Sequence, residues 1–149
     1  ELLFTKPAEE LEVMGDTDRL KQVFINIIDN ALKYTATGGM VGVQVYHDFK
    51  DNMIKIIIAD NGCGINQDDL PKVTDKFFKA NQKINGSGIG LAVADEIIKL
   101  HKGDLNIDSS IDVGTTVTIG LPIYNENSIF DEEPPIEAIP QNIAKDNNQ

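Results

Sequence analysis

Apolar residues recur at spacings of three and four in two segments of the chain, which is typical of the buried face of a helix. The first helix should begin at the Asp16 start signal and end near Tyr34. The second should cover residues 89–101, with Gly103 just past its end. The apolar positions are Leu20, Val23, Phe24, Ile27, Ile28, Ala31 and Leu32 in the first helix and Leu91, Ala94, Ile97 and Ile98 in the second.

Alternating and continuous apolar runs predict short strands around and between these helices. A short helix and a polar loop should separate the middle strands from the second helix. Two or three helices on one face of a mostly antiparallel sheet make an α+β fold, a two-layer α/β sandwich. The strands are expected over Leu2–Thr5, 11–14, 41–47, 53–59, 105–108 and 115–121, the short helix over 67–76 and the loop over 77–87.

The composition is that of an ordinary globular domain, with 149 residues, 41% of them hydrophobic and 25% charged. Asp and Glu outnumber Lys and Arg by 24 to 13, and the net charge of −11 argues against nucleic-acid binding. The single cysteine, Cys63, excludes a disulfide framework and a Cys-rich zinc site, and we interpret it as structural.

The sequence contains neither a signal peptide nor an apolar run near the roughly 18 residues of a membrane span. We therefore expect a cytoplasmic domain that makes no membrane contact itself. The chain does not begin with Met, so we expect it to be a piece of a longer protein.

The acidic residues are unevenly distributed. Residues 125–149 carry six acids and one base, and they hold three of the six prolines but no glycine. This composition predicts a domain over residues 1–124 and an acidic, disordered tail over 125–149. A docking peptide around Ile136 and Ile139 is the functional alternative for the tail.

Polar residues form a stripe beside the apolar face of the first helix. At about 100° per residue, Asn26, Asn30 and Lys33 fall within roughly 60° of one another. Asparagine is a poor helix former, so two of them one turn apart need a reason. One explanation is that these polar side chains simply face solvent. The other is a site where amide oxygens bind a hard cation such as Mg²⁺ and the lysine meets phosphate.

Two further features have the chemistry of a nucleotide site. Asp60 ends an apolar strand, where it could accept a hydrogen bond from an exocyclic amine or could simply belong to a turn. Gly86, Gly88 and Gly90 open the second helix, where free N–H groups suit phosphate oxygens. This glycine run fits neither the Walker nor the Rossmann pattern, and tight turns would also explain it.

Five segments resemble, in order, the boxes of the catalytic and ATP-binding domain of bacterial sensor histidine kinases. The resemblance covers roughly residues 1–123. It implies the Bergerat fold of the GHKL superfamily, a mixed sheet backed by three helices with ATP between a helix and a flexible lid. The segments are 26–35 (Asn-Ile-Ile-Asp-Asn-Ala-Leu-Lys-Tyr-Thr, N box), 60–65 (Asp-Asn-Gly-Cys-Gly-Ile, G1 box), 76–79 (Lys-Phe-Phe-Lys, F box), 86–91 (Gly-Ser-Gly-Ile-Gly-Leu, G2 box) and 114–116 (Gly-Thr-Thr, the last box).

The resemblance implies roles for individual positions. Asn30 would bind Mg²⁺ with help from Asn26, and Asn30 and Lys33 would be catalytic. Asp60 would select adenine. The residues expected to contact ATP are Asn26, Asn30, Lys33, Tyr34, Asp60, Gly62, Gly64, Ile65, Phe78, Lys79, Gly86, Ser87, Gly88, Ile89, Gly90, Leu91 and Thr115.

The proposed lid is basic in an otherwise acidic chain, because Lys72, Lys76, Lys79 and Lys83 lie within 12 residues. A solvated charged face would also explain such lysines. By resemblance, Lys79 reaches the phosphates from a position where the family usually has Arg. Phe77 and Phe78 are expected to anchor the lid to the core.

The reaction is inferred from a residue that is missing. Related gyrase, Hsp90 and MutL ATPases have a water-activating Glu one turn before the magnesium-binding Asn, where this chain has Asn26, which cannot act as that base. The resemblance therefore implies transfer of the γ-phosphoryl group, in two-component signalling, to a histidine on an adjoining helical dimerisation domain that precedes Glu1.

The resemblance also implies partners: a homodimeric full-length protein, in many cases membrane-anchored, and a response regulator. His47 at a strand end and His101 in the last helical turn, where a cation suits the helix dipole, do not fit the acceptor. A serine kinase resembling anti-sigma factors and a non-catalytic nucleotide-binding module remain alternatives.

Overall fold

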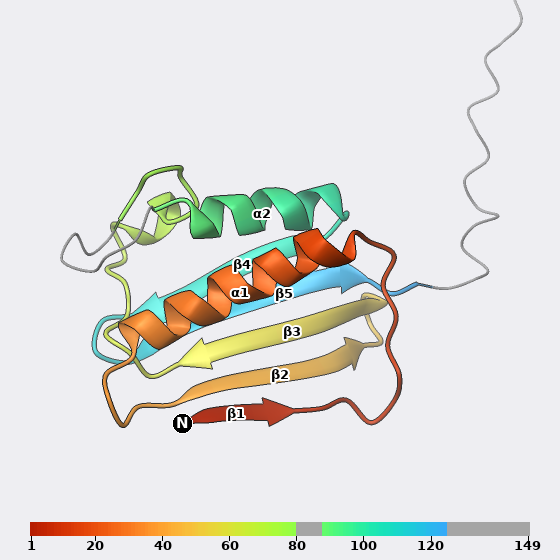
Figure 1. Ribbon diagram of the computed structural model, residues 1–149, viewed down its shortest axis with the longest axis horizontal. Helices are drawn as coiled ribbons and strands as arrows, with labels where there is room; N and C mark the ends of the chain where they lie inside the picture. The colour runs from red at the N-terminus through yellow and green to blue at the C-terminus, as the bar shows by residue number, and fades with distance from the viewer. Residues whose placement is uncertain (80–87, 125–149) are drawn as a thin grey trace, which may run out of the picture.

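The computed structural model describes residues 1–79 and 88–124 as one five-stranded sheet with helices on one face (Figure 1). The strand order is β1-β2-β3-β5-β4; β1 is parallel to β2 and the other neighbours are antiparallel. The expected α+β, two-layer architecture is confirmed. The strands are β1 (Leu2–Thr5), β2 (Val41–Asp48), β3 (Met53–Asp60), β4 (Asp104–Ser110) and β5 (Gly114–Pro122).

The helical layer consists of α1 (Thr17–Tyr34) and α2 (Gly90–Leu100), which pack against each other above the sheet (Figure 1). Both helices lie within two residues of their expected bounds. Their apolar faces meet alternate residues of β3 and β5, which close a single core. The most buried large side chains are Ile27, Ile58, Ile98, Ile119, Val23 and Val41. Within the described residues, no helix is long and apolar enough to cross a membrane.

The directions of the helices and strands bring several of their ends to one edge of the fold. The register pairs Asp60 with Val41 on one side and with Thr115 on the other. The last residue of α1, Tyr34, accepts a hydrogen bond from the Cys63 N–H at 3.1 Å. Figure 1 shows the start of α2 at the same end, so the predicted boxes converge there.

Two of the expected elements differ from the structure. Residues 11–14 form no strand, because β1 already pairs with Val41 to Gln44 on the open side of β2. Leu11 and Val13 nevertheless pack against the core, which explains their alternation. The helix expected over 67–76 is a single 3-10 turn, η1 (Leu70–Lys72), since only Val73 in this stretch is buried in the core.

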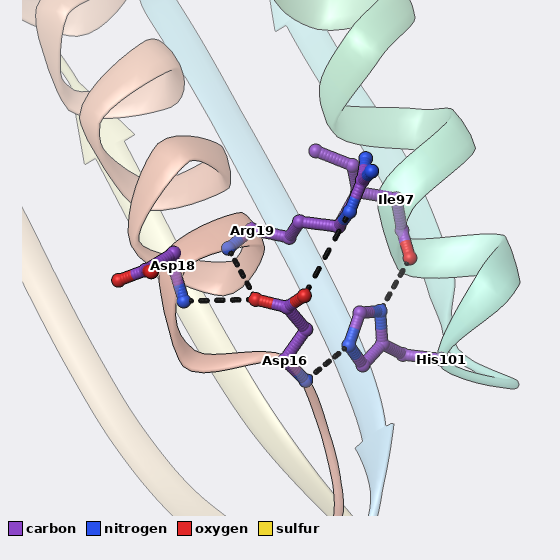
Figure 2. A network of polar contacts seen from close by, with 5 residues as sticks. All are labelled: Asp16, Asp18, Arg19, Ile97 and His101. Atoms are coloured by element: carbon purple, nitrogen blue, oxygen red, sulfur yellow. Dashed lines mark hydrogen bonds and ion pairs between the residues drawn. The ribbon is translucent and has the colours of Figure 1, made fainter.

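A polar network joins the start of α1 to the end of α2 (Figure 2). The Asp16 carboxylate caps α1 by accepting from the N–H groups of Asp18 and Arg19, at 3.0 and 3.1 Å. The His101 Nδ1 lies 2.7 Å from the Ile97 carbonyl, and its Nε2 lies 3.0 Å from the Asp16 N–H. A carbonyl only accepts and an amide N–H only donates. In this arrangement Nδ1 donates to the carbonyl and Nε2 accepts from the amide, so the ring links the two helices.

We expect His101→Ala to lower the free energy of unfolding by about 1–2 kcal/mol, because it leaves the Asp16 N–H and the Ile97 carbonyl without this partner. Urea denaturation measures the loss. Leu100→Ala is the matched control, since that neighbouring side chain is exposed. Equal stability of the two variants would contradict the role of the imidazole.

Candidate functional site

A cavity of about 550 Å³ opens at the edge where the boxes converge. It brings together most residues singled out from the sequence, which come from segments far apart in the chain. The expected residues in its walls are Asn26, Asn30, Lys33, Tyr34, Asp60, Gly64, Ile65, Phe78, Lys79, Gly88, Gly90, Leu91 and Thr115. Gly62 and Ile89 do not line it, and Gly86, Ser87 and Lys83 lie outside the described residues.

Asp60 is held in a fixed orientation at the end of β3. Its Oδ1 accepts hydrogen bonds from the N–H of Gly62 at 2.8 Å and the N–H of Thr115 at 3.3 Å. Among the described residues, Oδ2 has no such donor, so it is left for a ligand. Burial raises the pKa of the Asp60 carboxyl above its ordinary value, although the two backbone bonds act in the opposite direction.

Two glycines after Asp60 are required by the packing of the chain on itself. A Cβ at Gly62 would overlap the Tyr34 carbonyl oxygen, so only glycine fits against the end of α1 at this position. Gly64 has φ +70°, and a Cβ there would overlap the Ser110 carbonyl oxygen. Both glycines therefore let residues 61–66 pack closely against the end of α1 on one side and the β4–β5 turn on the other. This close packing shapes the cavity.

We expect Gly64→Ala to lower the free energy of unfolding by about 1–3 kcal/mol, because it adds a left-handed non-glycine residue and a steric overlap. Gly42→Ala is the control, since nothing lies within 4 Å of a Cβ at that strand position. Thermal or urea unfolding of both variants checks the prediction, and a tolerated alanine at Gly64 would contradict it.

The two asparagines of α1 both line the cavity. The Asn26 Nδ2 donates to the Gly90 carbonyl at 3.3 Å, which fixes the amide between α1 and α2 and leaves its oxygen available. Among residues 1–79 and 88–124, the Asn30 side chain has no hydrogen-bond partner. The described part of the chain also holds no cluster of three His, Cys, Asp or Glu that could bind a metal. Amide oxygens suit Mg²⁺ when bound phosphate supplies further ligands, so the two asparagine side chains fit a Mg²⁺ site of this kind.

The start of α2 exposes N–H groups of the kind that bind anions. Its N-cap residue, Ile89, makes no side-chain capping hydrogen bond, so within residues 1–79 and 88–124 no side chain caps the first N–H groups of the helix. Gly88 precedes it at φ +68°, and its carbonyl accepts from the Phe77 N–H at 2.9 Å. This bond ties the F-box segment to the helix start.

The basic and aromatic residues of the F-box segment separate into two groups. Phe78 and Lys79 line the cavity, whereas the Phe77 side chain is 74% exposed, so the expectation that Phe77 anchors the segment is wrong. Lys76 points elsewhere and pairs with Glu96 at 3.7 Å. Lys33 of α1, which is exposed, also lines the cavity and is a second cation beside the partly buried Lys79.

Tyr34 adds a phenol to the α1 wall. Burial raises the pKa of Tyr34 above its ordinary value, and the nearby Cys63 thiol adds to the effect. The phenol therefore stays protonated and can donate a hydrogen bond. Cys63 itself is exposed and lines the cavity, so its side chain is not part of the core.

The structure also adds residues that the sequence did not single out. The β4–β5 turn closes one side of the cavity although it carries no recognisable motif before Gly114. Asn66 and Asp69 follow directly after the G1 segment, and that proximity is the one sequence signal they had. The added residues are Ile27, Asp29, Ala31, Ile58, Cys63, Asn66, Asp69, Val73, Ile107, Ile111, Asp112 and Val117.

Comparison with known proteins gives consistent matches. A family model described as histidine kinase-, DNA gyrase B-, and HSP90-like ATPase matches residues 15–125. The sensor histidine kinase WalK of Bacillus subtilis is 38% identical over 130 residues, which cover 85% of this chain and 21% of WalK. Histidine protein kinase DivJ of Caulobacter vibrioides is 38% identical over 120 residues, covering 78% of this chain and 20% of DivJ.

The structural comparison agrees with the sequence matches. The mycobacterial sensor histidine kinase MprB superposes with a TM-score of 0.70 at 31% identity, over 83% of this chain and 80% of that one. The chain spans about a fifth of the length of the two curated relatives, which are therefore much larger proteins.

Proposed function

Because the chain belongs to the family of histidine kinase-, DNA gyrase B- and HSP90-like ATPases, we propose that it is the ATP-binding catalytic domain of a sensor histidine kinase. The observation that carries this proposal is the convergence of three groups on one cavity. These are the Asp60 carboxylate, the uncapped start of α2 and the paired amides of α1. We assign the domain to residues 1–124, in agreement with the end of the family match, and leave 125–149 as the acidic tail.

Asp60 reads the base in this proposal. Its free Oδ2 accepts a hydrogen bond from the N6 amine of adenine, while Gly62 and Thr115 hold Oδ1 in place. Gly64, Ile65 and Thr115 lie beside it in the cavity wall. A base that presents a carbonyl oxygen in place of the amine would face the carboxylate with like partial charge, so adenine is preferred.

The phosphates lie towards α2. The N–H groups at its start, with Gly88 before them, are proposed to bind phosphate oxygens, and Gly86 and Ser87 belong to the same proposed loop. Lys79 supplies positive charge from the F-box segment, and Lys33 and Tyr34 contact phosphate or ribose from α1. Phe78 covers the bound nucleotide.

Asn30, with Asn26 beside it, is proposed to hold Mg²⁺. When bound, the ion would neutralise negative charge on the phosphates during transfer. Lys33 stabilises charge on the transferred group, and the hydrogen bond from Asn26 to Gly90 keeps α1 at a fixed distance from the helix start. Positioning and charge neutralisation are what phosphoryl transfer requires of a protein.

The acceptor of the phosphoryl group is proposed to be a histidine on a separate helical dimerisation domain. Asn26 stands where related ATPases have the water-activating Glu, and an amide cannot act as that base, which disfavours hydrolysis as the main activity. The chain has two histidines, and neither is placed to accept the group. His101 links the two helices. His47 lies near the end of β2, opposite Ile54, whereas Asp60 lies opposite Val41 at the start of that strand.

The larger protein that this function implies is also a proposal. It would be a homodimer through the helical domain, it would pass the phosphoryl group to a response regulator, and it would act at the cytoplasmic side, with or without a membrane anchor. WalK and DivJ are named histidine kinases and are several times longer than the matched region.

A transfer assay tests the proposed function. The chain is incubated with γ-labelled ATP, Mg²⁺ and a histidine-bearing helical dimerisation domain from a sensor kinase of this family. Label that transfers and is lost in acid supports phosphohistidine. Acid-stable label on serine would replace the proposal with the serine-kinase alternative, and ATP binding without any transfer, even with the upstream region restored, would replace it with a binding module.

A further inference from the structure

Asp29 brings a negative charge to the cavity, and the proposed function gives it no role. It is an exposed residue of α1, one position before Asn30, and it lines the cavity. Among residues 1–79 and 88–124, neither a hydrogen bond nor an ion pair engages its carboxylate. An unpaired negative charge in a cavity proposed to bind phosphates needs an explanation, because like charges repel.

Asp29 and Lys33 have the spacing at which an acid and a base commonly pair on a helix. Asp95 and Lys99 have the same order and spacing on α2, and they form an ion pair at 2.6 Å. No such pair joins Asp29 to Lys33, although both residues are exposed and both line the cavity. Lys33 therefore does not neutralise the Asp29 carboxylate by direct contact.

The position of Asp29 along α1 is near the proposed phosphate end of the cavity. The Asn26 amide donates to the Gly90 carbonyl at 3.3 Å, which holds this turn of α1 against the start of α2. Asp29 follows three residues later, and residues three apart are neighbours on the surface of a helix. Phosphates bound at the first N–H groups of α2 would therefore lie close to the Asp29 carboxylate.

The charge of Asp29 acts differently on the two forms of the nucleotide. Free ATP carries more negative charge than its Mg²⁺ complex, by the charge of the ion. Because Coulomb repulsion is proportional to the product of the charges, Asp29 disfavours metal-free ATP more than it disfavours the complex. Asn26 and Asn30, the residues proposed to hold Mg²⁺, are neutral and make no such distinction by charge.

We propose that Asp29 is a specificity-determining residue that makes the cavity discriminate against nucleotide without its metal ion. This inference rests on the proposed nucleotide-binding function. The repulsion is relieved when the ion is bound, so Asp29 favours the form of the nucleotide that phosphoryl transfer uses. Metal-free ATP lacks the charge neutralisation that transfer needs, and Asp29 keeps this unproductive ligand from filling the cavity.

The test is the ratio of two dissociation constants for ATP, measured by calorimetry on the full chain in a chelator and in excess Mg²⁺. Asp29→Asn keeps the shape of the side chain and removes its charge. The ratio of the chelator value to the Mg²⁺ value is expected to fall about fivefold, mainly through tighter binding in the chelator. A merely structural role would change both constants alike and leave the ratio unchanged.

Two further variants serve as controls. Asp29→Glu retains the charge and should keep the wild-type ratio. Asp18→Asn removes the same charge from an exposed residue of the same helix, about 16 Å away along the axis, and should also keep it. At that distance, beyond the Debye length of about 10 Å at 0.1 M salt, the charge is largely screened.

The salt dependence gives a second readout. The difference between Asp29→Asn and wild type in the chelator should shrink as the salt concentration rises, because salt screens an exposed charge. An unchanged ratio in Asp29→Asn, or weaker binding of ATP in the chelator, overturns the inference while leaving ATP binding intact. If the wild-type chain binds ATP in neither condition, the proposed function itself is overturned, and this inference with it.

Discussion

Asp60→Asn is expected to weaken ATP binding about hundredfold, because a charge-assisted hydrogen bond to the base is lost. The shape of the side chain is unchanged, so the loss of affinity comes from which atom of the amide faces the base. The N–H groups of Gly62 and Thr115 both point at one oxygen, and only the oxygen of an asparagine can accept from them. The NH₂ group must then face the N6 amine of adenine, where a donor meets a donor.

The same substitution should leave the unliganded protein at least as stable as wild type. Burial raises the pKa of Asp60, so the folded state holds a proton there more tightly than the unfolded chain does. The stability gained from the protonated form is present at low pH and is lost as pH rises through the raised pKa. Asparagine is neutral at every pH and keeps both backbone hydrogen bonds, so the variant avoids this loss at neutral pH.

Calorimetry with ATP and urea denaturation without ligand measure the two effects of Asp60→Asn separately. Asp112→Asn is the matched control, because it removes a carboxylate from the same cavity wall without touching the Asp60 bonds. Unchanged ATP affinity in Asp60→Asn would contradict its role as base reader. A marked loss of stability together with the lost affinity would show that Asp60 mainly holds the fold.

Asn30→Ala is expected to slow phosphoryl transfer on the order of 10²- to 10³-fold, because removing one group that stabilises transition-state charge has effects of this size. Within the described residues its amide has no protein partner, so its loss should not disturb α1. The effect should appear only through the metal. ATP affinity with Mg²⁺ should fall, whereas affinity measured in a chelator should match the wild-type value.

The control for Asn30→Ala is Leu32→Ala, which changes an exposed residue of the same helix outside the cavity. Circular dichroism and urea denaturation should give similar stability for both variants. If Asn30→Ala loses affinity equally with and without Mg²⁺, its amide contacts the nucleotide directly and the metal assignment is wrong.

The sequence was most informative where one local rule acted alone. The spacing of Leu20, Val23, Ile27 and Ala31 and the Asp16 cap were sufficient to place α1, because a helix is specified by its own residues. The apolar run over residues 53–59 placed β3 in the same way, within one residue of its observed end. In residues 11–14 alternation failed, since the pattern reports burial and not the presence of a strand to pair with.

The candidate site was predictable where a motif carried it and not where tertiary contacts did. Asn26, Asn30 and Asp60 could be selected from spacing and strand position, and the cavity contains all three. The β4–β5 turn could not be selected, because Ile111 and Asp112 reach the cavity only through sheet pairing.

The most direct test of the account is calorimetric titration of the chain with Mg²⁺-ATP, followed by the same titration with Mg²⁺-GTP. The account predicts one site per chain for ATP and at least about tenfold weaker binding of GTP, since the Asp60 carboxylate accepts from the adenine amine and would face the carbonyl oxygen of guanine. Absence of ATP binding, or equal binding of the two nucleotides, would contradict the assignment of the cavity as an adenine-nucleotide site.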